Sequence, residues 1–184
     1  MTAGDREGVA GVPHTLLDIR SADQAVEQLY REHRLHMVRL AYLLVGDRES
    51  AEDVAQDAFA ALHRHWHRLR NTEAAVGYLR TATVNGARSL LRRRRTVRQF
   101  PQPDEAALSV ESAEATSMLS AEHREVLAAM HQLPDRQREV LLLRYWSELG
   151  EAEIARTLGI SVGAVKSNAS RGRATIATML GQDR

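Results

Sequence analysis

Polar and basic side chains gather between residues 161 and 173, at a spacing that places them on one side of a helix. Lysine and arginine bind phosphate oxygens, whereas serine hydroxyls and asparagine amides can hydrogen-bond base edges in the major groove. This combination is typical of a DNA-recognition helix. The residues expected to contact duplex DNA are Ser161, Lys166, Ser167, Asn168, Ser170, Arg171 and Arg173.

The surrounding sequence predicts a helix-turn-helix over residues 150–172. Gly159 can adopt the positive φ of a sharp turn at no steric cost, and Ser161 can cap the second helix. The small side chain of Ala155 suits the close crossing of two helices. The alternative is a surface hairpin of a helical bundle. The residues expected to point inward are Ile154, Ala155, Leu158, Val162 and Val165.

A second basic face is expected on a helix over residues 73–95, which ends in the run Arg92–Arg95. Cations at a helix carboxyl end are favourable with the dipole, which would account for the run without a ligand. Four consecutive arginines exceed that need and repel one another, so the run favours phosphate contact. Either Asn71 or Thr72 can cap this helix. The outer face carries Arg80, Asn85, Arg88 and Ser89.

A helix that begins at Asp47 or Ser50 and runs to about Trp66 presents an acidic and polar row. Ser50 and Asp53 have the spacing of a capping box. Val54, Ala55, Ala58 and Leu62 form its inward stripe. The opposite side is expected to be exposed. Such a row is by default only a solvated face, but with an aromatic side chain on it, it can be a partner-docking surface. That row comprises Asp53, Gln56, Asp57 and Phe59.

Catalytic and metal chemistry finds little support in the residue pattern. His63 and His67 could share a helix face, but no third ligand follows at a useful spacing, so we expect no metal site. A metal-dependent nuclease that uses His63, His65 and His67 is the enzyme alternative, and it lacks a convergent carboxylate set. No G-x-x-x-x-G-K-[ST] motif is present. We expect a protein without catalytic residues or cofactors.

Composition predicts an all-α protein. The chain has 184 residues, a net charge of +1, and no cysteine, which excludes disulfides and thiol chemistry. No apolar run approaches membrane-spanning length and no signal pattern opens the chain, which favours a cytoplasmic protein. After a disordered tail (1–20) we expect a helix over about 22–45. A flexible acidic linker (97–117) should then join a three-helix amino-terminal module (21–96) to a four-helix carboxy-terminal module (118–181).

Five motifs in order carry a family resemblance: AEDVAQDAF, YLRTATVNGARSLLRRRR, an acidic linker, LPDRQREVLLLRYW and EIARTLGISVGAVKS. Together they resemble bacterial RNA polymerase sigma factors of the sigma-70 family, in the extracytoplasmic-function (ECF) group. The VGAVKSNASR stretch is most similar to the actinobacterial SigE-like branch. The resemblance covers residues 22–180 and implies that 21–96 correspond to sigma region 2 and 118–181 to sigma region 4.

The resemblance implies a transcription initiation factor whose partners are core RNA polymerase and promoter DNA. Asp53, Gln56 and Asp57 match the motif that docks on the β′ clamp helices, and Phe59 lies beside them; the second module would contact the β flap. An anti-sigma factor is a further possible partner. The remaining matches imply −10 recognition by Arg68, Asn71, Thr72, Arg80, Asn85, Arg88, Ser89, Arg92 and Arg93.

Three departures from the family pattern lie in the recognition helix. Asn168 and Ala169 stand where Arg-Leu is usual, and Asn168 can read adenine, so the −35 preference is expected to differ. Gly172 replaces a usual alanine, which should cost about 1 kcal/mol of helix stability and let the helix end fray. The main rival to a sigma factor is a stand-alone helix-turn-helix regulator that binds a palindrome as a dimer.

Overall fold

The structure is a computed structural model in which residues 14–69, 71–99 and 121–182 are described. All regular structure among these residues is helical, as predicted. None of the described helices has the length and apolarity needed to cross a bilayer. In chain order they are α1 (His14–Val45), α2 (Arg48–His65), the short 3-10 helix η1 (Trp66–Arg68), α3 (Thr72–Gln99), α5 (Ala121–Gln132), α6 (Asp135–Tyr145), α7 (Glu151–Leu158) and α8 (Val162–Gln182).

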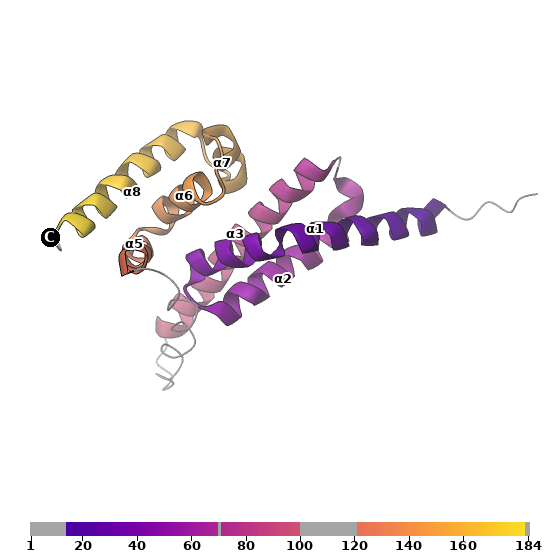
Figure 1. The fold of residues 1–184 in the computed structure, drawn as a ribbon, viewed down its shortest axis with the longest axis horizontal. Coiled ribbons are helices and arrows are strands. Elements are labelled where there is room, and N and C mark those ends of the chain that lie inside the picture. Colours follow the sequence, from indigo (N-terminus) through magenta and orange to yellow (C-terminus); the bar gives the residue numbers. More distant parts are fainter. Residues whose placement is uncertain (1–13, 70, 100–120, 183–184) are drawn as a thin grey trace, which may run out of the picture.

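Helices α1, α2 and α3 form the amino-terminal module (Figure 1). Their facing sides bury Met37, Leu62 and Leu79 in one apolar cluster, as the helical spacing of these residues predicts. The predicted tail is wrong for residues 14–20, because α1 begins at His14. Residues 1–13 lie outside the described part of the chain. The module therefore has the three predicted helices, the first of them longer than expected.

The start of α2 differs from the predicted capping box. Asp47 is the N-cap, and its Oδ1 accepts a hydrogen bond from the Ser50 backbone N–H at 2.9 Å. Asp47 Oδ2 also lies 2.8 Å from Arg94 Nη1 of α3. Burial alone would raise the pKa of Asp47, but the hydrogen bonds from Ser50 and Arg94 together hold that pKa below its usual value. The amino end of α2 is thus fixed to the last turns of α3.

Helices α5 to α8 form the carboxy-terminal module and contain the predicted helix-turn-helix in α7 and α8. Gly159 has a φ of +64° and ends α7 in the left-handed conformation. The Ser161 hydroxyl oxygen accepts a hydrogen bond from the Ala164 N–H at 3.2 Å and so caps α8. Ile154 and Val165 are fully buried between the two helices. The turn, the cap and this buried pair are confirmed as the sequence predicts them.

The two modules pack against each other (Figure 1). Helix α3 contacts α7, and α1 contacts α5 and α6. One cluster of buried apolar side chains runs through both modules and includes Leu40, Val84, Leu141 and Ile154. The predicted flexible linker between the modules gives no indication of this packing. Of the predicted linker, residues 97–99 are the end of α3 and the rest lies outside the described residues.

Gly172 is buried where α8 crosses α6. A Cβ atom at this position would lie 2.9 Å from Leu141 Cδ1 and 3.3 Å from Gln137 Cβ. Helix α8 continues through Gly172 to Gln182, so the expected fraying is wrong. Glycine here permits the close approach of two helices, and its cost in helix propensity is offset by that packing.

Gly172→Ala is therefore expected to lower the free energy of unfolding by about 1 kcal/mol. The helix gains up to about 1 kcal/mol of intrinsic propensity, but the added methyl group overpacks the contact with α6 at a cost of about 1–3 kcal/mol. Gly181→Ala is the matched control, because a Cβ there meets nothing within 4 Å. Urea unfolding followed by circular dichroism measures both variants. A Gly172→Ala protein as stable as the parent would contradict the packing role.

Candidate nucleic-acid interface

The predicted duplex-binding residues lie on the outer face of α8, except for Ser161, which caps the start of that helix. All of them are exposed except Asn168, which is half-buried. Its Nδ2 donates a hydrogen bond to the Ala164 carbonyl at 2.8 Å, so this donor must leave the helix backbone before it can bind a base. Lys166 Nζ lies 3.6 Å from Glu151 Oε2 of α7. The exposed members of the row are Ser161, Lys166, Ser167, Ser170, Arg171 and Arg173.

Two residues near this row lie elsewhere than predicted. The prediction that Val162 points inward is wrong: it is 40% exposed because it is the first residue of α8, before the helix turns Val165 into the core. Ala169 is only 3% exposed and packs inside the module. Of the three departures from the family pattern, only Asn168 has a side chain near the outer surface, because Ala169 and Gly172 are buried.

The outer face of α3 carries the other predicted DNA-binding set. Asn85, Arg92 and Arg93 are exposed, whereas Arg80, Arg88 and Ser89 are half-buried. At the start of this helix and just before it, Arg68, Asn71 and Thr72 are exposed. Asn71 is the cap of α3, since its Oδ1 accepts a hydrogen bond from the Ala74 N–H at 2.8 Å.

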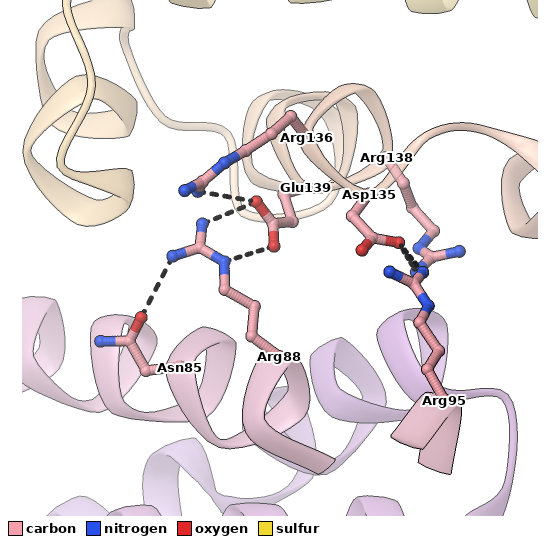
Figure 2. Close-up of polar contacts among 7 residues, drawn as sticks. All are labelled: Asn85, Arg88, Arg95, Asp135, Arg136, Arg138 and Glu139. Carbon is pink, nitrogen blue, oxygen red and sulfur yellow. Dashed lines mark hydrogen bonds and ion pairs between the residues drawn. The ribbon is translucent and has the colours of Figure 1, made fainter. Parts of the chain in front are cut away.

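A carboxylate from the other module occupies the centre of the α3 face. Figure 2 shows Glu139 of α6 pointing at Arg88, whose Nε and Nη2 donate to its two carboxylate oxygens at 2.5 and 2.6 Å. Arg136 Nη1 adds a third contact at 3.2 Å. The Glu139 side chain is 3% exposed, so this is a nearly buried, bidentate ion pair. Arg88 Nη1 also donates to Asn85 Oδ1 at 3.2 Å.

The run of four arginines divides between two kinds of contact. Arg94 donates to Asp47 and to the Ser50 hydroxyl, so it holds α2 and α3 together. Arg95 Nη2 lies 2.9 Å from Asp135 Oδ1 of α6 (Figure 2). Within the described part of the chain, Arg92 and Arg93, the two that the resemblance assigns to phosphates, are the members of the run that are exposed without such an inter-helix ion pair.

Asp135 also lies 3.2 Å from Nη2 of Arg138, a buried arginine of α6. Burial lowers the pKa of Arg138, against the opposing effect of the Asp135 and Glu139 carboxylates. The sequence does not predict the inter-module pairs. An acidic residue in DRQRE has many possible partners, and only the packing of the modules selects Arg88 and Arg95.

Three of the four residues in the predicted docking row on α2 lie at the surface. Asp53, Gln56 and Asp57 are all exposed. Phe59 is expected beside them, but it is only 5% exposed and packs edge-to-face on Tyr30 of α1, with ring centroids 5.0 Å apart. An aromatic at this position gains more from burial between α1 and α2 than from exposure. The docking face, as the structure presents it, comprises Asp53, Gln56 and Asp57.

The histidines at the end of α2 point to different partners. His63 Nε2 lies 2.7 Å from Asp23 Oδ1 of α1. His65 Nδ1 lies 2.8 Å from the Ala61 carbonyl oxygen and 3.1 Å from the Tyr78 hydroxyl. Across the described residues, no group of three or more His, Cys, Asp and Glu side chains is placed to hold a metal ion. These contacts join α1, α2 and α3.

An apolar groove of about 1000 Å³ is lined by residues of α1, α2, α5 and α6. Leu35, Val126 and Tyr145 line it and are 56%, 42% and 59% exposed. Trp146 also lines it and stacks on His36, with ring centroids 5.9 Å apart. Burial, and then the nearby Arg80 charge, lower the pKa of His36. The groove is thus an apolar surface at the junction of the modules, and no feature of the sequence alone predicts it.

Comparison with known proteins matches the two modules separately. Residues 29–97 match the family model "Sigma-70 region 2", and residues 123–176 match "Sigma-70, region 4". The ECF RNA polymerase sigma factor SigM of Mycobacterium tuberculosis is 31% identical over 157 residues, which cover 85% of this chain and 78% of that protein. The RNA polymerase sigma-E factor of Streptomyces coelicolor is 28% identical over 150 residues, which cover 82% of each protein.

Two solved structures share the fold. The sigma factor RpoE, in complex with the anti-sigma factor NepR from Bartonella quintana, has a TM-score of 0.67 at 22% identity and covers 86% of this chain and 98% of its own. CnrH, in complex with the cytosolic domain of CnrY, has a TM-score of 0.62 at 24% identity and covers 91% of this chain and 99% of its own.

Proposed function

The chain belongs to the ECF RNA polymerase sigma factors, and we propose that it docks on core polymerase through Asp53, Gln56 and Asp57 and contacts the promoter through α3 and α8. It directs polymerase to promoters and starts transcription there. The observation that carries the assignment of surfaces is their separation: an acidic, solvent-accessible face on α2 and two basic faces on α3 and α8. A protein that binds duplex DNA alone has no use for the first of these.

The carboxy-terminal module is proposed to bind the −35 duplex through the exposed row of α8. Lys166, Arg171 and Arg173 supply cations for phosphates or guanine edges, and the serines between them supply hydroxyls. The Ser161 cap and the buried Val165 hold this helix at a fixed angle to α7. The module is proposed as residues 118–181.

The amino-terminal module, proposed as residues 21–96, is assigned to the −10 element. Asn85 and Ser89 face the bases, and Arg92 and Arg93 face the backbone phosphates. Arg68, Asn71 and Thr72 would line the loop that receives a base extruded from the duplex. Extrusion costs unstacking energy, which stacking and edge contacts must offset. Promoter opening is then driven by binding energy, and the protein acts without catalysis, in the cytoplasm where polymerase works.

Purified core polymerase with and without this chain, on fragmented genomic DNA, tests the proposal directly. We expect defined transcription start sites that appear only when the chain is present. Tight binding of a symmetric dimer to duplex DNA, with no initiation from any fragment, would instead favour the stand-alone regulator. The two outcomes differ in both stoichiometry and product, so one set of reactions separates them.

Arg171→Ala is expected to weaken −35 recognition by about 1–3 kcal/mol, or roughly fivefold to 150-fold, if the guanidinium binds a base in the bidentate manner. The side chain is exposed, and its Nε makes only a long hydrogen bond of 3.4 Å to the Ser167 carbonyl, so folding should not change. Transcription from promoters with every −35 base substituted in turn measures the loss of discrimination. An unchanged promoter profile would remove Arg171 from the base-contacting set.

The apolar groove between the modules is proposed to receive a helix of an anti-sigma factor. The structurally similar sigma factor RpoE forms a complex with the anti-sigma factor NepR, and a helix in an apolar groove is a common recognition mode. Leu35 and Trp146 lie in the groove and remain accessible. Helical peptides from an anti-sigma factor should bind the parent chain, and Leu35→Asp should abolish that binding. Equal binding to both would place the partner elsewhere.

A further inference from the structure

We infer that the packed arrangement of the two modules is a closed state in which the Glu139 carboxylate occupies the Arg88 guanidinium in place of DNA. The inference rests on the proposed assignment of α3 to the −10 element. In the free protein Arg88, at the centre of that face, is blocked, although Asn85, Arg92 and Arg93 are exposed, and the modules must separate before Arg88 can bind nucleic acid.

The Glu139 carboxylate binds Arg88 in the same way as a phosphate group would. A guanidinium binds carboxylates and phosphates through the same planar fork of N–H donors. Glu139 takes up Nε and Nη2 of Arg88 at 2.5 and 2.6 Å (Figure 2). A phosphate cannot occupy this fork while the carboxylate is in place. Arg88 is only 26% exposed in this state, so approach of a DNA strand is also blocked.

The neighbouring polar groups extend the block. Asn85, the proposed base-contacting residue, accepts a hydrogen bond from Arg88 through Oδ1, so one of the two lone pairs of that oxygen is already used. Farther along α3, Arg95 pairs with Asp135. Arg95 is 65% exposed, so its pair adds little to closure. The Glu139 contact, almost fully shielded from solvent, is the one that decides access.

The free-energy difference between the closed and open states is expected to be small. Removing Glu139 and Arg88 from water costs free energy that offsets most of their mutual attraction, so a single substitution can shift the ratio of closed to open molecules. The apparent affinity of the free chain for DNA is reduced by the fraction of molecules that are closed. Any change that opens the modules should therefore raise the affinity for DNA without altering the DNA-contacting residues.

Glu139→Gln tests the inference, because glutamine keeps the shape and one acceptor oxygen but removes the charge. The chain has no cysteine, so Ala60→Cys and Ala177→Cys, both on exposed sites of different modules, provide unique positions for two fluorophores. We expect lower energy transfer and about tenfold tighter binding to fluorescent single-stranded DNA of random sequence, at constant ionic strength, than in the labelled parent. Glu125→Gln, at an exposed glutamate of the same module, should leave both readings unchanged.

Asp135→Asn is a second variant that leaves Glu139 in place and should give a smaller change in the same direction. Circular dichroism of each variant confirms that the helices are retained. Unchanged energy transfer and DNA affinity in a folded Glu139→Gln protein would overturn the closed state, even if that protein still directs polymerase to promoters. Failure of the parent and all variants to support initiation would overturn the proposed function instead, so the two failures are distinguishable.

Discussion

Replacing Asp57 by arginine is expected to weaken binding to core polymerase by at least about 100-fold. Asp57 is exposed on α2, one turn from Asp53. A row of carboxylates is complementary to a basic partner, and placing like charges opposite each other across an interface costs several kcal/mol. About 2.8 kcal/mol corresponds to the 100-fold loss. Because the side chain contributes nothing to the core, the folded structure should be unaffected.

The measurement is equilibrium binding of the labelled chain to core polymerase, followed by promoter-dependent transcription with the same samples. Asp57→Asn should lie between the parent and Asp57→Arg, since it removes the attraction without adding repulsion. Glu125→Arg makes the same reversal of charge on exposed α5 and controls for the change in net charge. Equal losses for Asp57→Arg and Glu125→Arg would show a nonspecific charge effect and contradict the docking face.

The docking face is accessible in the packed state, whereas Arg88 of the −10 face is not. This difference suggests that polymerase binding precedes DNA binding by Arg88. Gln56 and Asp57 are exposed while the modules are packed, whereas Arg88 is held by Glu139. Polymerase can therefore bind the closed protein first. Contacts between polymerase and each module could then offset the free-energy cost of separating the two modules. Once both modules are held on polymerase, their two weak DNA contacts would act together through effective concentration. In this order Arg88 contacts DNA only after the factor has reached polymerase.

The helical architecture can be predicted from the sequence because its signals are local. The spacing of apolar residues gives each helix, and Gly159, Ser161 and Asn71 give the turn and two caps through contacts that reach three residues along the chain. The start of α2 is ambiguous in the sequence because Asp47 and Ser50 both offer a capping oxygen. The structure selects Asp47, which Arg94 also holds from α3.

The site is predicted less completely because long-range packing decides exposure. Phe59 lies next to the polar row of α2 in the sequence pattern, which suggests exposure. Only the position of Tyr30 on α1 shows that the Phe59 ring is buried. The Glu139 contact joins residues 51 positions apart, and no periodicity encodes it. The sequence predicts fraying at Gly172 from helix propensity, which is a property of α8 alone. The neighbours of Gly172 belong to α6, and their close approach makes glycine favourable at this position.

Leu141→Ala is expected to destabilise the protein by about 3–5 kcal/mol. Leu141 is 2% exposed and belongs to the apolar cluster shared by both modules. Truncating such a side chain removes its transfer free energy and leaves a cavity that the helices close only in part. Leu35→Ala, at a leucine that is 56% exposed, is the control and should cost less than about 0.5 kcal/mol. Urea unfolding followed by circular dichroism gives the comparison, and a cost below about 1 kcal/mol for Leu141→Ala would contradict the packing of this side chain in the shared core.

Combining Leu141→Ala with Gly172→Ala separates packing from helix propensity. In the parent, the new Cβ would lie 2.9 Å from Leu141 Cδ1, so Gly172→Ala is expected to destabilise. In the Leu141→Ala background that atom is absent, and alanine should instead stabilise by up to about 1 kcal/mol through helix propensity. The sign of the Gly172→Ala effect should therefore reverse between the two backgrounds. The same sign and size in both would mean that Gly172 acts through the helix alone, and that the approach of α8 to α6 does not require it.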